Sequence, residues 1–259
     1  MKKIVSHLST DWYKYLLELI VITAGILAAF GLNNWNENRK DRLQEVAILG
    51  QLKTGFESNL DQMDEKIEIR DRMLEAALQL LKFIDNPANR VKDSINISIA
   101  WTIPYTTFDP IINDLASSGS LRIIKSDSLK QLLSFWTSEI IQVSEGEASW
   151  TKYRNEVYVP FLVKHYQLRT MRNQSMQTNL LRSFLINQAD RSDSYKITEI
   201  GTSKHKEDYN YLLDQPDYED HLVRLIVSNR NTQHQAYILR DRMVSILDLI
   251  NSELTSKEL

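Results

Sequence analysis

The sequence contains no cysteine and little glycine, which excludes several kinds of active site. With no cysteine in 259 residues, disulfides, cysteine-ligated zinc and thiol catalysis are all excluded. Seven glycines leave little material for phosphate-binding loops, and neither an H-E-x-x-H nor a G-x-S-x-G motif is present. The histidines lack metal-ligand spacing: His7, His165, His205, His221 and His234. These absences predict a protein that is not an enzyme and uses no cofactor or metal.

An excess of basic charge is also missing. The chain has 31 lysine and arginine residues against 34 aspartate and glutamate residues, a net charge of −3. Domains dedicated to nucleic-acid binding are usually strongly basic. We therefore expect no nucleic-acid partner.

The longest apolar run lies near the N-terminus. No charged residue occurs from Leu19 to Leu32. A helix from Trp12 to Trp35 would be about 33 Å long, enough for a hydrocarbon core of about 30 Å. Its aromatic ends suit the two membrane interfaces. The sequence predicts a transmembrane helix over residues 12–35, after a short tail over residues 1–11.

A cleaved signal peptide and a buried core helix are the alternatives. Against cleavage stand the acidic residues Asp11 and Glu18 and the absence of an A-x-A site. Basic residues flank both ends of the helix, but the short tail carries little besides Lys2 and Lys3. We expect an N-terminus in the cytoplasm and a main domain in the periplasm.

Small and acidic residues in this helix suggest contact with a second transmembrane helix. Gly25 and Ala29 are four residues apart, which would let another helix approach closely, although small residues are common in membrane helices. Glu18 is costly near the hydrocarbon boundary and requires a partner. That partner is either Lys14, one turn earlier, or a basic residue on a partner helix.

These residues resemble a known family. They are Glu18, Gly25 and a polar box closing the helix, Asn33, Asn34, Trp35, Asn36 and the four residues that follow. A second match covers Leu115–Lys125, with an S-G-S-L segment followed by I-K. The chain resembles uncharacterised bacterial single-pass membrane proteins that carry a domain of unknown function. The resemblance implies a location in the bacterial inner membrane and no particular activity.

A heptad pattern follows the membrane segment. From Val46 onward two series of apolar residues recur seven apart, and only Lys53 and Arg70 break them. Such a seam requires partner helices along its length. We predict a helix over residues 36–85, stopped by Pro87.

The pattern then changes to period two. Isoleucines and Trp101 alternate with Asn96, Ser98, Ala100 and Thr102 from Ile95 to Ile103, which predicts a strand. It would pair with Leu121–Ile124 or Tyr195–Ile200, or else form an extended strip packed on helices.

Further helices are indicated by caps and apolar stripes. Pro160 should kink or end the second long helix. The predicted ranges are a short helix at 109–119, a long helix at 127–166, short helices at 180–187 and 204–213, and a long helix at 217–256.

The second long helix can return antiparallel to the first, towards the bilayer. An acid-free stretch would then lie close to the headgroups. It is either a lipid-binding surface or an ordinary solvated connection. Its basic residues are Lys164, Arg169, Arg172 and Arg182.

Three polar residues interrupt the apolar face of the last helix, namely Asn229, Thr232 and Gln233. Buried polar residues in a helical seam more often fix register than bind a ligand.

The fold predicted from these patterns is mainly α. It consists of a transmembrane helix continuing into one antiparallel long-helix bundle over residues 36–259, with a minor extended segment near 95–103. The predicted function is a non-enzymatic scaffold or adaptor of a cell-envelope assembly, whose partners are the bilayer and either a second copy or an envelope protein. The alternative is a ligand-sensing bundle that signals through a partner.

Overall fold

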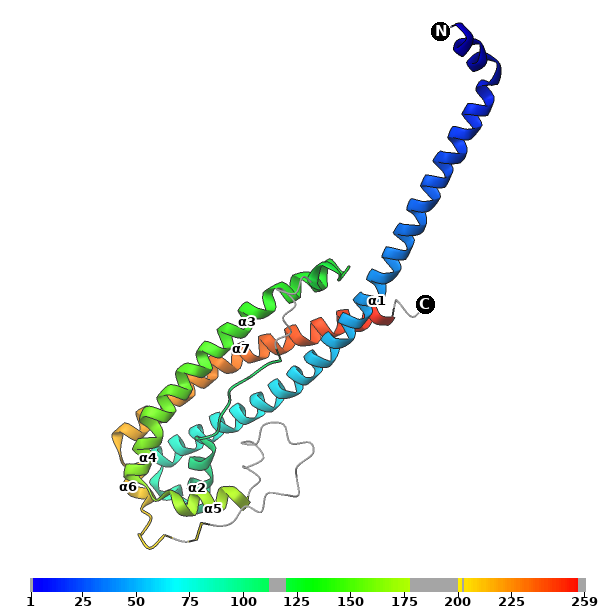
Figure 1. The fold of residues 1–259 in the computed structure, drawn as a ribbon. Coiled ribbons are helices and arrows are strands. Elements are labelled where there is room, and N and C mark those ends of the chain that lie inside the picture. Colours follow the sequence, from blue (N-terminus) through cyan, green and yellow to red (C-terminus); the bar gives the residue numbers. More distant parts are fainter. Residues whose placement is uncertain (1, 112–119, 178–199, 202, 256–259) are drawn as a thin grey trace. The chain divides into compact units, whose positions relative to one another are not determined.

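The computed structural model is helical, as the sequence predicts. It describes residues 2–111, 120–177, 200–201 and 203–255, and no strand occurs among them. By packing, the chain divides into one unit of residues 1–51 with 115–125 and a second of residues 52–114 with 126–259. Helix α1, Lys2–Asp85, contributes to both units (Figure 1).

In the first unit, the side chains in the apolar stretch of α1 are exposed. Leu27 is 66% exposed and Phe30 64% exposed. Within the described residues, the helix that contains this stretch is long and apolar enough to cross a membrane. Further along α1, the carboxylate of Glu45 accepts a hydrogen bond from the Lys125 backbone N–H at 2.6 Å, which ties the chain before α3 to α1.

The second unit holds the remaining long helices. Helices α3 and α7 pack against each other, and α2 packs against α5 (Figure 1). The elements are a 3₁₀ turn Pro87–Asn89, α2 Lys92–Trp101, α3 Asp127–Tyr153, a π-helix Arg154–Tyr158, α4 Val159–His165, α5 Leu168–Gln177, α6 Tyr209–Leu213 and α7 Pro216–Thr255.

The long helices form the predicted bundle, but one of them runs in an unexpected direction. Helix α7 is antiparallel to α1, because Arg240 pairs with Asp64 while Gln233 pairs with Arg70. The return of the second long helix towards the start of the bundle was predicted wrongly. Helix α3 runs parallel to α1, because Phe56 packs on Trp136 and Arg70 pairs with Glu147.

The cause of that reversal lies between α2 and α3. Helix α2 was predicted wrongly as a strand at 95–103. The buried residues Ile95, Ile99 and Ala100 face the core on one side of a helix, so tertiary packing overrides the β-propensity of alternating isoleucines. After a turn at Thr102 and Ile103, the extended strip begins at Pro104 and leads the chain back along α1 (Figure 1).

Local signals set the ends of α3 and α7. The Ser126 side chain caps α3 by accepting from the Leu129 N–H at 3.4 Å. Pro160 lacks an N–H and its ring crowds the carbonyl four residues earlier. The chain responds by widening into the π-helix, where the Val159 N–H bonds to the Arg154 carbonyl. Pro216 opens α7, as predicted.

The main apolar core lies where α1, α2, α3, α4, α6 and α7 meet. Trp150, Tyr158 and Tyr218 are its largest side chains, each at most 2% exposed. Two of the predicted short helices, at 109–119 and 180–187, lie largely or wholly outside the described residues, as do Arg182 and most of Tyr195–Ile200. The predicted helix at 204–213 is shorter, beginning at Tyr209 after the cap Asp208.

Candidate functional site

The centre of the second unit holds a buried ion pair. The Arg70 guanidinium donates to the Glu147 carboxylate at 2.6 Å, and both side chains are at most 1% exposed. Burial lowers the pKa of Arg70 from its ordinary value, and the Glu147 carboxylate opposes this change. Because arginine titrates far above neutral pH, the guanidinium stays charged. Burial raises the pKa of Glu147, and the charge of Arg70 and the Phe108 N–H oppose that rise. A pair of charges taken out of water needs further hydrogen bonds to be tolerated.

The predicted polar layer of α7 supplies part of that hydrogen bonding. Gln233 accepts from Arg70 at 2.9 Å and donates to the carboxylate of Asp71 at 2.7 Å. Asn229 and Thr232 are buried as well, but they donate back to carbonyls of their own helix at 3.0 Å each. Of these three residues, Gln233 therefore belongs to the polar centre, by which we mean Arg70, Glu147 and the groups that hydrogen-bond to them.

The remaining partners belong to residues 102–111, which we call the strap: a turn at Thr102 and Ile103 followed by extended chain. Arg70 donates to the Thr106 carbonyl at 3.2 Å, and the Phe108 N–H donates to Glu147 at 2.8 Å. Further along, Asn59 both donates to and accepts from the backbone of Ile111, at 3.1 and 2.7 Å. Side chains of α1 and α3 therefore satisfy the strap backbone, as a neighbouring strand would do in a sheet.

The π-helix fixes the other end of the strap. It turns Arg154 inward, where the guanidinium donates to the carbonyls of Ile103 and Pro104 at 3.0 and 3.1 Å. The same group lies 3.6 Å from the ring centre of Tyr105. Tyr158 shares a 2.7 Å hydrogen bond with Thr102, and burial raises the pKa of this tyrosine to about 12. All these polar groups hold backbone in place, so we assign the polar centre to structure.

Close approach of α3 and α7 beside this centre depends on Gly146. A Cβ built there would lie 2.8 Å from the Thr232 hydroxyl oxygen. Threonine is stiff at χ1, so we expect Gly146→Ala to lower the free energy of unfolding by about 1–3 kcal/mol, as overpacking does. Urea denaturation of the full chain in micelles measures this. Gly50→Ala is the control, because its Cβ would meet nothing within 4 Å. A Gly146→Ala chain as stable as the wild type would refute the close contact.

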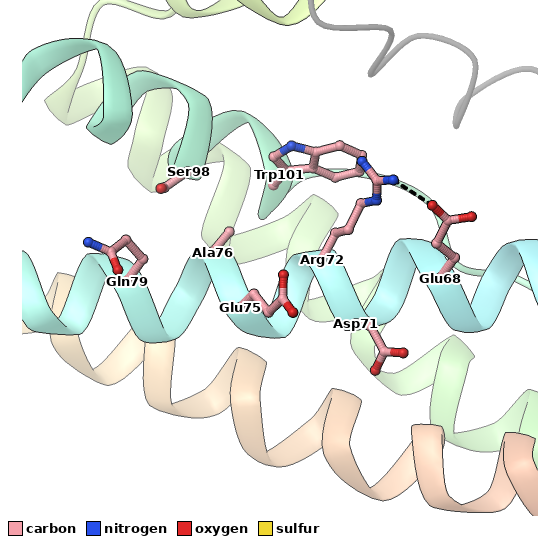
Figure 2. A pocket seen from close by; sticks show the side chains of 8 residues that line it. All are labelled: Glu68, Asp71, Arg72, Glu75, Ala76, Gln79, Ser98 and Trp101. Carbon is pink, nitrogen blue, oxygen red and sulfur yellow. Dashed lines mark hydrogen bonds and ion pairs between the residues drawn. The ribbon is translucent and has the colours of Figure 1, made fainter.

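A groove lies between α1 and α2, on the surface. Its cavity volume is about 620 Å³ and its lining is Glu68, Asp71, Arg72, Glu75, Ala76, Gln79, Ser98 and Trp101. The Arg72 guanidinium lies over the Trp101 ring, 5.2 Å from its centre, and pairs with Glu68 at 2.5 Å (Figure 2). This site combines carboxylates with an aromatic face, a chemistry that suits cations.

A cluster of rings surrounds two histidines where α4 meets α7. The Phe161 ring lies 4.4 Å from the ring of His221 and 4.5 Å from that of His165, centre to centre. The Tyr153 hydroxyl shares a 2.7 Å hydrogen bond with Nδ1 of His221. Burial lowers the pKa of His221, although the nearby Asp217 and Asp220 oppose that shift.

The lowered pKa of His221 predicts a loss of stability in acid. The unfolded chain takes up this proton near the ordinary value of 6.5, whereas the folded chain does so only at lower pH. Stability contributed by the neutral ring is therefore present above about pH 6.5 and is lost as the pH falls through it. His221→Gln should reduce the loss seen between about pH 7.5 and 5, whereas exposed His205→Gln should leave it unchanged. Equal losses in the wild type and His221→Gln would contradict the assignment.

The residues predicted near the membrane are all exposed. A Cβ at Gly25 would meet no atom within 4 Å, and Glu18 and Ala29 are also exposed. Within the polar box, Asn33 donates to Glu37 at 3.0 Å, while Arg39 lies 6.0 Å from the Trp35 ring centre. Asn34 and Asn36 are exposed beside them. A partner for Glu18, whether Lys14 or a second chain, stays a prediction.

The basic residues predicted to touch lipid lie elsewhere than the predicted topology would place them. Lys164 is in α4, and Arg169 and Arg172 are in α5. Helix α5 packs on α2, at the end of the second unit opposite Leu52. The antiparallel return from which this contact was argued does not occur, and the contact of these residues with lipid stays a prediction.

Residues 18–133 match the model of DUF6090, a family of unknown function. No curated protein and no solved structure matches the chain. The matched range takes in the exposed apolar stretch, most of α1, α2 and the strap, and the beginning of α3. In the described part of the chain, no group of three histidine, aspartate or glutamate side chains could hold a metal ion.

Sequence reasoning missed several members of the polar centre, although a signal was present. Leu133 and Ile140 are apolar residues seven apart in α3, and the next residues at the same spacing are Glu147 and Arg154. Both are 2% exposed. Arg70 lies in an apolar series of α1 and was treated only as an interruption of it. An arginine that faces inward on one helix predicts an acid that faces inward on another.

Proposed function

We propose that this protein is a single-pass membrane protein of the bacterial inner membrane whose helical unit serves as a non-enzymatic scaffold or adaptor in a cell-envelope assembly. The observation that carries the proposal is the exposure of an uninterrupted apolar stretch of α1. Soluble proteins rarely expose so large an apolar surface without a partner. A bilayer covers such a helix all round, and its length suits one crossing.

The geometry of the second unit favours a scaffold over an enzyme. Three of its buried charged groups, Arg70, Glu147 and Arg154, hydrogen-bond to one another or to the strap backbone. Catalytic acids and bases need access to a substrate, and these groups have none. A long rigid bundle with its charges used internally suits a protein that positions others.

A ligand-sensing bundle is less well supported. Small-molecule sites enclose most of the ligand and are largely apolar. The α1–α2 groove is lined by four charged side chains, Glu68, Asp71, Arg72 and Glu75, two of which are more than half exposed. This surface suits another protein better than an enclosed ligand.

Gentle purification of the full-length protein from its native membrane, followed by mass spectrometry, tests the scaffold proposal. We expect a defined envelope protein, or a second copy, to co-purify with the wild type and to be lost from a Glu18→Gln/Gly25→Leu variant. An added side chain at Gly25 meets no atom of this chain within 4 Å, so the loss would reflect a partner.

Gly31 offers a matched control, since it is also open within 4 Å but lies about 120° around the helix from Gly25. The single variant Gly31→Leu, in which Glu18 is unchanged, should therefore still co-purify with the partner. Recovery of the protein alone in every form would refute the scaffold proposal.

A further inference from the structure

The α1–α2 groove already holds one cation, supplied by the chain itself. Arg72 is flanked by the Trp101 ring at 5.2 Å and the Glu68 carboxylate at 2.5 Å. Figure 2 shows the guanidinium between the two, with Ala76 and Ser98 further along the groove. The arrangement demonstrates that a planar cation fits between this aromatic face and this carboxylate.

The internal cation is held weakly. The side chains of Arg72 and Glu68 are 52% and 64% exposed, and exposed ion pairs of this kind contribute little because water and salt screen them. Arg72 can therefore swing into solvent at small cost. Trp101 is only half-buried, so its ring would then be open to another cation.

The groove is acidic even with Arg72 in place, because three carboxylates line it against this one guanidinium. Asp71 points away from Trp101 in Figure 2, towards Gln233 and Tyr237, with which it hydrogen-bonds. The two carboxylates left to receive a ligand are Glu68 and Glu75, one on either side of Arg72 along α1.

We infer that the α1–α2 groove docks an arginine-bearing segment of a partner protein, whose guanidinium replaces Arg72 on the Trp101 ring and pairs with Glu68 and Glu75. The inference rests on the proposed adaptor function and names the chemistry of the partner. Arginine fits better than lysine, because its planar fork both stacks on an aromatic face and pairs with carboxylates. Anionic partners are repelled by the same charges.

Peptide binding to the full-length protein in zwitterionic micelles tests this inference. The probes are three capped peptides that differ only at two positions of a Gly-Ser background: two arginines, two lysines or two citrullines. We expect the arginine peptide to bind about threefold more tightly than the lysine peptide, given the added stacking. The citrulline peptide, which is neutral and of similar shape, should not bind measurably.

Variants with matched charge changes locate the site. Glu68→Gln/Glu75→Gln should weaken the arginine peptide about tenfold, whereas Glu57→Gln/Asp61→Asn, which removes two exposed charges of α1 outside the groove, should weaken it less than about twofold. Arg72→Gln removes the internal competitor and should strengthen binding about threefold. Lys152→Gln makes the same charge change on α3 and should not.

The outcomes separate this inference from the proposed function. If both double variants weakened binding of the arginine peptide equally, or if the arginine and lysine peptides bound equally well, the groove would not be the arginine site. This would hold even if a partner co-purifies with the protein. Groove-specific arginine binding would support the inference, and the co-purification experiment would then decide on its own whether the protein is an adaptor. Retained melting temperatures in the variants show that each chain is folded.

Discussion

Replacing Arg70 by methionine should lower the free energy of unfolding by about 3–5 kcal/mol, the usual cost of leaving one member of a buried ion pair uncompensated. Glu147 would keep its hydrogen bond from the Phe108 N–H but lose its counter-charge. Gln233 and the Thr106 carbonyl would lose their donor as well. Urea denaturation of the full chain in micelles, followed by tryptophan fluorescence, measures the change.

Arg72→Met is the matched control, because this arginine is two residues away and 52% exposed. It should cost less than about 1 kcal/mol. If Arg70→Met proved no more destabilising than Arg72→Met, the polar centre would not be a stabilising feature of the unit.

A double variant separates the ion pair from its role in holding the strap. In some proteins, replacing both members of a buried pair by apolar residues restores stability. Here Arg70→Met/Glu147→Leu should stay at least about 2 kcal/mol below the wild type. The Phe108 N–H and the Thr106 carbonyl would be left without partners, and each buried orphan costs about 1–3 kcal/mol. Full recovery would show that the strap does not need the pair.

The second large effect concerns the membrane segment. Ile22→Arg/Ile26→Arg should remove the protein from the membrane fraction. Each arginine near the centre of a spanning helix costs about 2.5–3.5 kcal/mol on insertion scales. The two isoleucines that the arginines replace favour insertion, and their contribution is lost as well. Cell fractionation with alkaline extraction of the membranes measures the redistribution.

A matched pair of arginines outside the apolar stretch controls for general damage. Val223 and Val227 on α7 have the same spacing and are 45% and 54% exposed. Val223→Arg/Val227→Arg should leave the protein in the membrane fraction. Retention of Ile22→Arg/Ile26→Arg after alkaline extraction would mean that the apolar stretch does not anchor the chain.

Sequence patterns predicted the long helices well because those patterns are local and extend over many turns. The caps of α3 and α7 and the effect of Pro160 were readable for the same reason. The extended segment was misplaced by about two helical turns, because the isoleucines at 95–99 fit both a strand and the buried side of a short helix. Only the packing of α2 on α5 and the core decides between them.

The direction of α3 could not be read from helix lengths. A chain that ends one helix at Asp85 ordinarily begins the next one nearby, since helix connections are short. Here the strap carries the chain back along α1 before α3 begins. Arg70, which helps to hold the strap, interrupts an apolar series in α1, so the sequence contained part of the signal as an apparent error in the heptad pattern.

Cysteine accessibility in native membranes tests the central claim that α1 crosses a membrane while the bundle lies outside it. Because the chain has no cysteine, single cysteines report unambiguously. In cells with a permeabilised outer membrane, a membrane-impermeant maleimide should label Asp61→Cys and leave Leu27→Cys unlabelled until the membrane is dissolved. If the maleimide labelled Leu27→Cys as fast as Asp61→Cys, in variants that still fractionate with the membrane, the account would be contradicted.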